Sequence, residues 1–193
     1  IADRTVRNRL TLGGNLAGML PYREAALPLL VADAMVHSLA PGPGGSEPVR
    51  RERRLRELFD RRLVLAPGEL VLAFSVSAAA AQWPWHHRRK TRTGPVDYPL
   101  ATTCLARDGQ AIRLAIAGAH PYPFRSDAID AALTALFAAM LAGGSDSPTG
   151  QARGGLEAVV RAFGPLKGDS RASAEYRVHL LQNMIRTSLE KLA

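Results

Sequence analysis

The stretch VRNRLTLGGNLAGMLPYREAALP, Val6 to Pro28, places two adjacent glycines and an asparagine between two apolar segments. Glycine has no β-carbon, so another group can approach this backbone closely. Successive N–H groups of such a segment can form a concave anion-binding nest, and Thr11 and Asn15 add side-chain donors beside it. However, Gly-Gly-Asn is also a common turn, and the stretch matches neither Gly-x-Gly-x-x-Gly nor the phosphate loop that ends in Gly-Lys-Ser/Thr. The residues alone therefore favour a turn.

The composition is that of an ordinary folded chain. Of its 193 residues, 47% are hydrophobic and 22% are charged, which is not a disorder signature. We expect no membrane span and no signal peptide, because no apolar run approaches about 20 residues. Cys104 is the only cysteine, so intramolecular disulfides and cysteine-based metal or iron–sulfur sites are excluded. These features predict a cytoplasmic protein with one domain or two small ones.

Positive charge dominates the chain and is unevenly distributed. The formal net charge is +8, and arginines crowd residues 50–62 and 88–92. Such a balance is compatible with a nucleic acid, an acidic partner or an anionic ligand. No recognised nucleic-acid module accompanies the charge, so an arginine-rich solvated surface is favoured over nucleic-acid binding.

The first half of the chain mixes short helices and strands. Leu27 to Val36 predicts a short helix that leads into a strand. Ala40 to Pro48 is a proline- and glycine-rich loop, and Leu55 to Leu63 predicts a short helical or irregular segment. After a Pro-Gly turn, Val71 to Val76 predicts another strand.

The second half predicts a hairpin followed by three helices. Tyr98 to Leu105 and Ala111 to Ala117 are the expected strands, joined by a tight turn. Amphipathic helices are expected over residues 126–141, around residues 156–163, and from Asp169 or Ser170 to the end. The pattern predicts an α+β chain with an antiparallel sheet and a three-helix bundle. We place the boundary between a first domain, residues 1–85, and a second domain, residues 86–193.

Five stretches, in order along the chain, carry a family resemblance: VRNRLTLGGNLAG, LAPGELVLAFSV, RRKTRTGPVDYPLATTCL, IRLAIAGAHPYPFRSDAIDAAL and DSRASAEYRVHLLQNMIRTSLEKL. They resemble the second flavin-binding loop, a following strand, a basic segment, a strand with a proline pair and a helix, and the last helix of one family. This family is the FAD-binding (medium) subunit or domain of the molybdenum hydroxylases, which include xanthine dehydrogenase and carbon monoxide dehydrogenase. The resemblance implies the second subdomain of a PCMH-type FAD-binding domain, followed by a carboxy-terminal domain of antiparallel sheet plus three helices.

The resemblance also implies FAD as the cofactor and assigns residues to it. The expected diphosphate-holding positions in the glycine segment are Thr11, Gly13, Gly14 and Asn15. Glu24 falls at an acidic position near the flavin ring, where the family usually has Asp. Val71 falls at an apolar position beside the ring, and the basic neighbour of the flavin falls on Arg89 or Lys90, with Lys90 the chosen position. No catalytic residue and no metal ligand are expected in this chain.

One wall of the flavin site has no counterpart in these residues. The family has an earlier glycine-rich loop, in an amino-terminal FAD subdomain, and nothing here matches it. A glycine-rich loop before Ile1 would complete the site, and these residues do not determine whether one exists. Residues 1–193 alone are expected to bind FAD negligibly.

The function implied by the resemblance is that of an oxidoreductase subunit of the xanthine dehydrogenase type, which is not active alone. Electrons would pass from a molybdopterin-binding large subunit through a 2Fe–2S small subunit to FAD, and then to an acceptor such as NAD, oxygen or a quinone. A second hypothesis is a non-redox scaffold that docks partner subunits through an incomplete flavin site. A third, from charge alone, is a nucleic-acid binder.

Other residues that could carry chemistry favour structural roles. His86 and His87 lack the spacing of metal ligands and are expected to be a surface pair. Trp83 and Trp85 are expected to anchor the core or an interface. Cys104 lies in an expected buried strand and should be inert.

Overall fold

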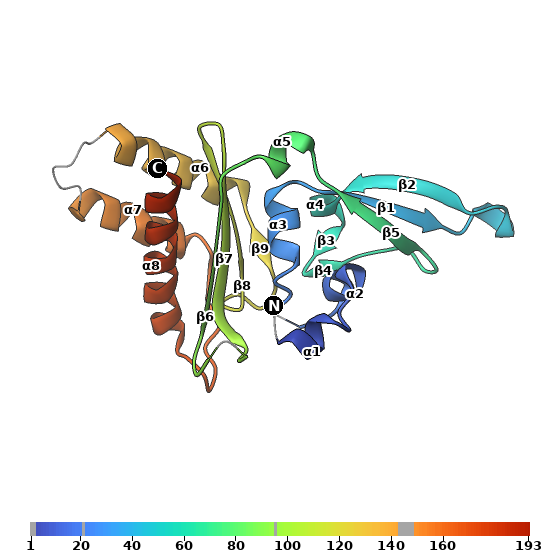
Figure 1. Cartoon of the computed structure of the whole chain (residues 1–193), viewed down its shortest axis with the longest axis horizontal. Helices are drawn as coiled ribbons and strands as arrows, with labels where there is room; N and C mark the ends of the chain where they lie inside the picture. The colour runs from blue at the N-terminus through green and yellow to red at the C-terminus, as the bar shows by residue number, and fades with distance from the viewer. Residues whose placement is uncertain (1–2, 21, 95, 143–148) are drawn as a thin grey trace.

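The structure is a computed structural model that describes residues 3–20, 22–94, 96–142 and 149–193. Three parts lie side by side in Figure 1: a group of helices, a four-stranded sheet and an elongated arm of three strands. The carboxy-terminal half forms the helices and the four-stranded sheet. The amino-terminal half forms the arm and the short elements between the arm and the sheet.

The amino-terminal half is built from short elements. Its helices are α1 (Arg4–Arg7), α2 (Leu12–Ala17), α3 (Ala26–Val31), the 3-10 turn η1 (Pro43–Gly45), α4 (Leu55–Leu58) and α5 (Ala78–Ala81). Its strands are β1 (Met35–Ala40), β2 (Val49–Arg54), β3 (Phe59–Asp60), β4 (Arg62–Leu63) and β5 (Leu70–Ser75). The arm is an antiparallel sheet in the order β2-β1-β5, and β3 pairs with β4 in a short hairpin. The helix-to-strand prediction for residues 27–36 and the strand predicted over 71–76 are confirmed.

Strand β2 was not predicted from the sequence. Its residues, VRRERR, contain no alternation of apolar and polar positions, because it is an edge strand with almost every side chain exposed. Pairing with β1 holds it in the sheet. The charge run is therefore mostly solvated, as expected, but it forms a strand rather than an irregular surface segment.

The carboxy-terminal half begins with a continuous antiparallel meander. Its strands, in the spatial order of the sheet, are β6 (Trp85–Thr91), β7 (Pro99–Asp108), β8 (Ala111–Ala117) and β9 (Phe124–Arg125). The predicted hairpin is β7–β8, with Gly109 at φ 60° in its turn, a conformation that glycine adopts without strain. Strand β6, which contains the second basic run, was not recognised from the sequence because its pattern is polar.

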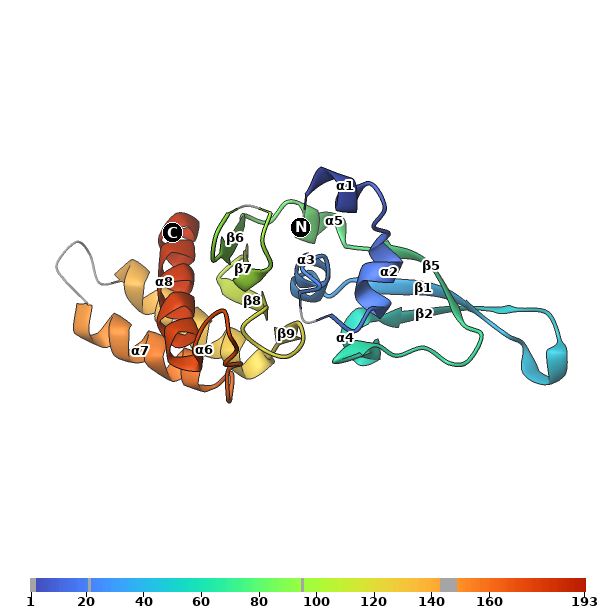
Figure 2. The same cartoon turned by 90° about the horizontal axis from the view of Figure 1, so that it is seen from below.

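The two faces of this sheet differ in side-chain size. Large residues face the helices α6 (Asp127–Ala142), α7 (Thr149–Arg161) and α8 (Ala174–Leu192). On that face the large side chains are Leu105, Ile112, Leu114 and Ile116. The opposite face carries the small side chains Cys104, Ala106, Ala115 and Ala117. Because these side chains are small, α3 of the amino-terminal half packs closely on this second face, as Figure 2 shows.

Helix α8 begins at a different residue from the one predicted. Its N-cap is Ser173, whose Oγ accepts a hydrogen bond from the Tyr176 amide, rather than Asp169 or Ser170. Asp169 instead accepts hydrogen bonds from the amides of Arg171 and Ala172 and pairs with Arg177 at 2.8 Å. The segment before α8 is thus folded around a carboxylate.

Arg177 is fully buried between α8 and the sheet. Its Nη1 donates to the backbone carbonyls of Leu100 and Gly118, which lie on and beside adjacent strands. Its Nη2 donates to Asp169. This one side chain therefore connects the last helix to the ends of the two central strands of the sheet and to the segment that precedes the helix.

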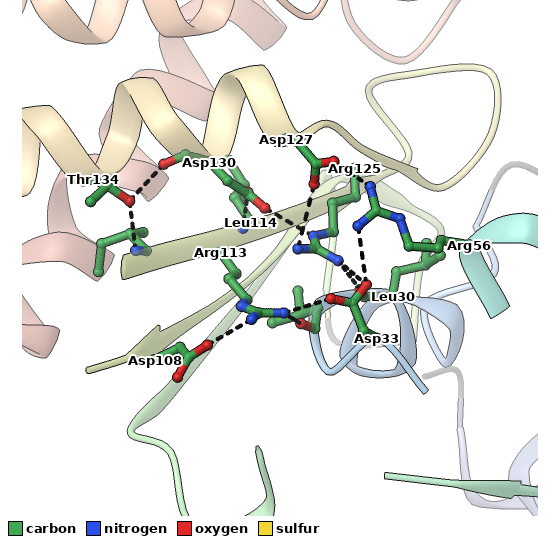
Figure 3. Close-up of polar contacts among 12 residues, drawn as sticks. Leu30, Asp33, Arg56, Asp108, Arg113, Leu114, Arg125, Asp127, Asp130 and Thr134 are labelled. Atoms are coloured by element: carbon green, nitrogen blue, oxygen red, sulfur yellow. Dashed lines mark hydrogen bonds and ion pairs between the residues drawn. The ribbon is translucent and has the colours of Figure 1, made fainter. Parts of the chain in front are cut away.

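A second network of charges joins the two halves of the chain, and Figure 3 shows it in close-up. At its centre is Asp33, which follows α3 with φ 49°. Its carboxylate accepts from Arg113 of β8 at 2.7 Å and from Arg125 of β9 at 2.5 Å. Arg56 of α4 lies 3.6 Å from it and also contacts Asp127. The end of α3 is therefore fastened to the sheet by charge-assisted hydrogen bonds.

The proposed domain boundary falls inside a shared core. Residues of α2, α3, β1 and α4 form one buried cluster with the small face of β7 and β8, and Trp83 and Trp85 pack against it. The expectation that these tryptophans anchor a core is confirmed, since the rings stack with centroids 6.1 Å apart. The division into residues 1–85 and 86–193 stays a prediction.

Replacing Arg177 with methionine should lower the free energy of unfolding by about 3 kcal/mol, because two carbonyls and a carboxylate lose a buried donor. The matched control on the same helix is Arg186→Met, which removes an exposed pair with Glu190. It should change stability by about 0.5 kcal/mol or less. Urea unfolding of both variants measures the difference, and equal effects would show that Arg177 has no bracing role.

The arm contains a buried carboxylate whose protonation should weaken it. Burial alone would raise the pKa of Glu69, but hydrogen bonds from Ser38, the Ala66 amide and Arg53 outweigh it and lower the pKa below 4.5. Its stabilising contribution is present above pH 4.5 and is lost as the pH falls through the lower folded value. The stability gap between wild type and Glu69→Gln should therefore be constant near neutral pH and shrink on acidification. A gap that widens in acid would contradict this assignment.

Candidate functional site

A cavity of about 410 Å³ opens where α1, α2, the segment before α3 and the loop between β6 and β7 meet. We call it the Asn15 cavity. Its lining residues are Asp3, Val6, Leu10, Asn15, Leu20, Tyr22, Glu24, Arg89, Val96, Asp97, Tyr98 and Pro99. Three residues that the sequence singled out, Asn15, Glu24 and Arg89, are thus brought to one place from distant parts of the chain.

The glycine segment is neither a turn nor a nest. It is the helix α2, in which Gly13 and Gly14 have no positive φ and lie within the first turn. Thr11 is the N-cap, and its Oγ1 accepts a hydrogen bond from the Gly14 amide at 3.0 Å. The prediction failed because adjacent glycines disfavour a helix, whereas the threonine cap and the packing of Leu16 stabilise this one.

The two glycines differ in the space around them. A β-carbon on Gly14 would lie 2.8 Å from Oγ1 of Thr11, so the cap itself excludes a larger residue there. A β-carbon on Gly13 would meet no atom within 4 Å. Nothing within the described chain therefore explains a glycine at position 13, which is what a ligand approaching this backbone would require.

Asn15 is half-buried on the same helix and lines the cavity. Within the described residues its Oδ1 is buried and has no hydrogen-bond partner. A buried polar atom left in this state costs free energy, so native structures normally satisfy it. The side chain can accept a hydrogen bond through its oxygen or donate through its amide, and either suits a polar ligand.

Glu24 and Arg89 form the polar wall of the cavity. Glu24 is 4% exposed, and its two carboxylate oxygens lie 3.1 and 3.2 Å from Nε of Arg89. Thr102 of β7 donates its hydroxyl to the same carboxylate at 2.7 Å. This buried set holds the residue before α3 against strands β6 and β7. It also fixes the direction of both charged groups that face the cavity.

The loop between β6 and β7 is held in place by Arg89 and by its own residues. Nη2 of Arg89 donates to the carbonyl oxygen of Asp97 at 2.5 Å. The Asp97 carboxylate accepts from the hydroxyl and amide of Thr93 and from the Tyr98 amide. These hydrogen bonds outweigh desolvation and lower the pKa of Asp97, so it is a carboxylate at neutral pH. The loop thus presents a fixed negative charge and Tyr98 at the rim.

Aromatic rings and a cation form another part of the rim. The rings of Tyr22 and Tyr98 lie 5.0 Å apart, and the guanidinium of Arg171 lies 4.8 and 5.4 Å from their centroids. Arg171 comes from the segment folded around Asp169, so the carboxy-terminal motif contributes to this site. Tyr98 is 59% exposed, which leaves one side of the pair open to a flat ligand. The sequence did not single out these tyrosines.

Two residues that the resemblance assigns to the flavin ring do not line the Asn15 cavity. Val71 is on β5 in the arm, where it packs against the core of the amino-terminal half and does not line the cavity. Lys90 is exposed and is likewise not a lining residue, whereas its neighbour Arg89 is. Successive residues of a strand point to opposite faces, so only one of the two basic residues can face the cavity. The structure favours Arg89 over Lys90, and contacts of either with a cofactor stay predictions.

Of the residues expected to have structural roles, Cys104 lies as predicted and the pair His86–His87 does not. Cys104 is buried, and burial raises the pKa of its thiol to about 12, which confirms inert packing. The expected surface pair of histidines is wrong, because His86 bonds Oγ of the buried Ser188 of α8 at 2.8 Å while His87 is exposed.

Among the described residues, no cluster of three or more His, Cys, Asp or Glu is placed to hold a metal ion. None of the helices in the described ranges combines the length and apolar character needed to cross a membrane.

Residues 1–77 match the family described as the FAD binding domain in molybdopterin dehydrogenase. Among solved structures, a carbon monoxide dehydrogenase from Hydrogenophaga pseudoflava that lacks the Mo-pyranopterin moiety of its molybdenum cofactor matches with a TM-score of 0.72 and 25% identity. A reconstituted CO dehydrogenase from Oligotropha carboxidovorans matches with a TM-score of 0.70 and 22% identity. Quinoline 2-oxidoreductase from Pseudomonas putida 86 matches with a TM-score of 0.68 and 19% identity.

Each of these matches covers 100% of the present chain but only 63%, 64% and 63% of the matched chain, respectively. The chain therefore spans a little under two thirds of the length of these structures. No sequence among the curated proteins matches it. The matches below 25% identity carry the fold alone, and they confirm the expected α+β class.

The pair Glu24–Arg89 should be energetically coupled. In a double-mutant cycle with Glu24→Gln and Arg89→Met, we expect a coupling free energy of about 1–3 kcal/mol, because removing either partner leaves the other charge buried. The exposed pair Arg186–Glu190 serves as the control and should show about 0.5 kcal/mol or less. Chemical unfolding of the single and double variants gives both values, and equal coupling in the two pairs would show that the cavity wall is not held by this contact.

Proposed function

We propose that this chain is an FAD-binding subunit of the molybdenum hydroxylases and that the Asn15 cavity receives part of its FAD. Residues 1–77 match the FAD-binding domain of molybdopterin dehydrogenases, and the chain resembles part of a carbon monoxide dehydrogenase structure, which supports this proposal. The single observation that carries this proposal is the buried side-chain oxygen of Asn15, which lines the cavity and has no partner among the described residues. Gly13 of the same helix adds a stretch of backbone that another group can approach. The residues present therefore fit a polar ligand that lies against the α2 backbone.

The residues in and near the cavity divide into groups with different tasks. Asn15 lines the cavity, and together with Thr11 and Gly13 of the same segment it would hold the ligand at the start of α2, where first-turn amides have no partner within the helix. Glu24 would face it as a carboxylate already oriented by Arg89 and Thr102. The tyrosine pair at the rim would shield a flat ring from water. When bound, FAD supplies the exchange of electrons, and the protein sets its position and electrostatic surroundings.

The assembly and the electron path are the finer part of the proposal. We propose that a molybdopterin-binding subunit and a 2Fe–2S subunit deliver electrons to FAD in this chain, which is not active alone. We also propose NAD as the electron acceptor, from the family resemblance, and a location in the cytoplasm, from the sequence. The exposed arginines of β2 and the net charge of +8 favour acidic partner surfaces.

Substituting Gly13 with alanine tests the site without harming the fold. The new methyl group meets no protein atom, and alanine is favoured over glycine in a helix by about 1 kcal/mol, so stability should be kept or raised. FAD content of the protein purified at its native length should fall, since the methyl group occupies the ligand's approach to the backbone. The matched control is Gly154→Ala in α7, whose β-carbon also meets open space. It should leave FAD binding unchanged.

The measurement is the flavin absorbance and fluorescence of the purified wild type and variants. Equal FAD content in both alanine variants would remove Gly13 from the site. Complete absence of FAD from the folded native-length wild type would contradict the whole proposal. That result would favour the alternative, a scaffold that docks partner subunits without carrying electrons.

A further inference from the structure

A second cavity, of about 680 Å³, lies between the hairpin β3–β4 and the segment that connects β8 to β9. We call it the arginine cleft. Its lining residues are Met19, Arg23, Asp60, Arg61, Arg62, Val64, His120, Pro121, Tyr122 and Pro165. It shares no lining residue with the Asn15 cavity. The function proposed above makes no use of it.

The turn that presents Arg61 is held in an uncommon conformation. Arg61 has φ 60°, a left-handed backbone that costs free energy for any residue except glycine. The guanidinium of Arg23, which is 3% exposed, donates to the carbonyl oxygen of Arg61. The other donors of Arg23 reach the carbonyls of Leu16 at 3.0 Å and Leu20 at 2.8 Å. A buried cation therefore fixes the turn so that the Arg61 side chain projects over Tyr122, 5.8 Å from the ring centroid.

Positive charge in the cleft is not balanced by carboxylates. Among the residues that the structure describes, Arg61 and Arg62 form no ion pair, and the donors of Arg23 reach only backbone carbonyls and not a carboxylate. Asp60 is the single acidic residue among those lining the cleft. Arg56 and Arg125, just beyond it, are by contrast paired with Asp127, Asp33 and Asp130. The cleft thus has an excess of positive charge that attracts an anion.

His120 supplies an unpartnered group inside the cleft. It is 8% exposed, its ring lies 4.4 Å from Tyr122 and 4.9 Å from Phe124, and its Nδ1 is buried without a partner in the described ranges. Burial lowers the pKa of this imidazole, although a backbone hydrogen bond to Tyr122 partly opposes the effect. A neutral imidazole has one nitrogen that donates and one that accepts. The free Nδ1 of the neutral ring therefore calls for a ligand that carries a proton.

We propose that the arginine cleft binds a phosphate group. Phosphate oxygens accept from the guanidinium groups of Arg61 and Arg62, and a P–OH group donates to Nδ1 of His120. A carboxylate would satisfy the two arginines but has no proton for the imidazole. Near neutral pH, free phosphate and phosphate monoesters carry such a P–OH group, whereas the diphosphate of FAD is a diester that has none. The expected ligand is therefore a free phosphate or a phosphate monoester. The proposal stands whether or not the Asn15 cavity holds FAD.

The test is a titration of the purified protein with inorganic phosphate, followed by calorimetry and by the NMR signals of the His120 ring. Phosphate should shift these signals. Arg61→Gly should weaken phosphate binding by about tenfold or more, the effect of one lost charge-assisted hydrogen bond. Its thermal midpoint should be unchanged or higher, because glycine adopts the left-handed turn without strain. His120→Gln should also weaken binding.

The control is Arg50→Gln on the exposed edge strand β2, which removes the same charge far from the cleft. It should leave phosphate affinity unchanged. The proposal is overturned if phosphate does not shift the His120 signals, or if Arg50→Gln weakens binding as much as Arg61→Gly.

A parallel titration with FAD tests which phosphate the cleft accepts. Arg61→Gly should weaken the binding of inorganic phosphate and leave the binding of FAD unchanged. Loss of FAD binding in Arg61→Gly would show that the cleft holds phosphates without a P–OH group, and it would overturn the role given to His120.

Discussion

The attachment of α3 to the small-residue face of the four-stranded sheet is the constraint on which the rest of the structure depends. The helix is fastened at both ends. Just before it, Glu24 binds Arg89 and Thr102 of β6 and β7. Just after it, Asp33 binds arginines of β8 and β9. Between these points, apolar contacts of α3 with alanines and Cys104 exclude water. The two halves of the chain are therefore one packed unit at this interface.

The attachment of α3 to the sheet also fixes part of the candidate site. Because Glu24 both anchors α3 and lines the Asn15 cavity, the wall of the cavity is set by the same hydrogen bonds that join the two halves. The carboxy-terminal motif acts from the other side. Asp169 and the buried Arg177 brace α8 against the sheet, and the same folded segment places Arg171 over the rim tyrosines. A site on such supports needs little reorganisation when a ligand binds.

Sequence patterns predicted elements best where apolar residues recur with one period. The hairpin of β7 and β8 and the three carboxy-terminal helices follow this rule and are confirmed, although α8 begins a few residues later than predicted. The strands β2 and β6 were not predicted, because edge strands rich in arginine show no alternation of apolar and polar residues. The helix α2 was not predicted, because two adjacent glycines have a low helix propensity. The Thr11 cap and the buried Leu16 stabilise it through contacts that helix propensity does not include.

The sequence by itself determined the fold class and the family resemblance, and it singled out Asn15 and Glu24, which both line one cavity. These properties reside in the identity and order of residues along short stretches. Only the tertiary structure decided that Arg89, and not Lys90, faces the cavity, and that Val71 lies away from it in the arm. It also revealed Arg61 and His120 together in a second cleft. The physical reason is that side-chain direction and long-range contacts depend on strand register and on packing between halves, which no local pattern encodes.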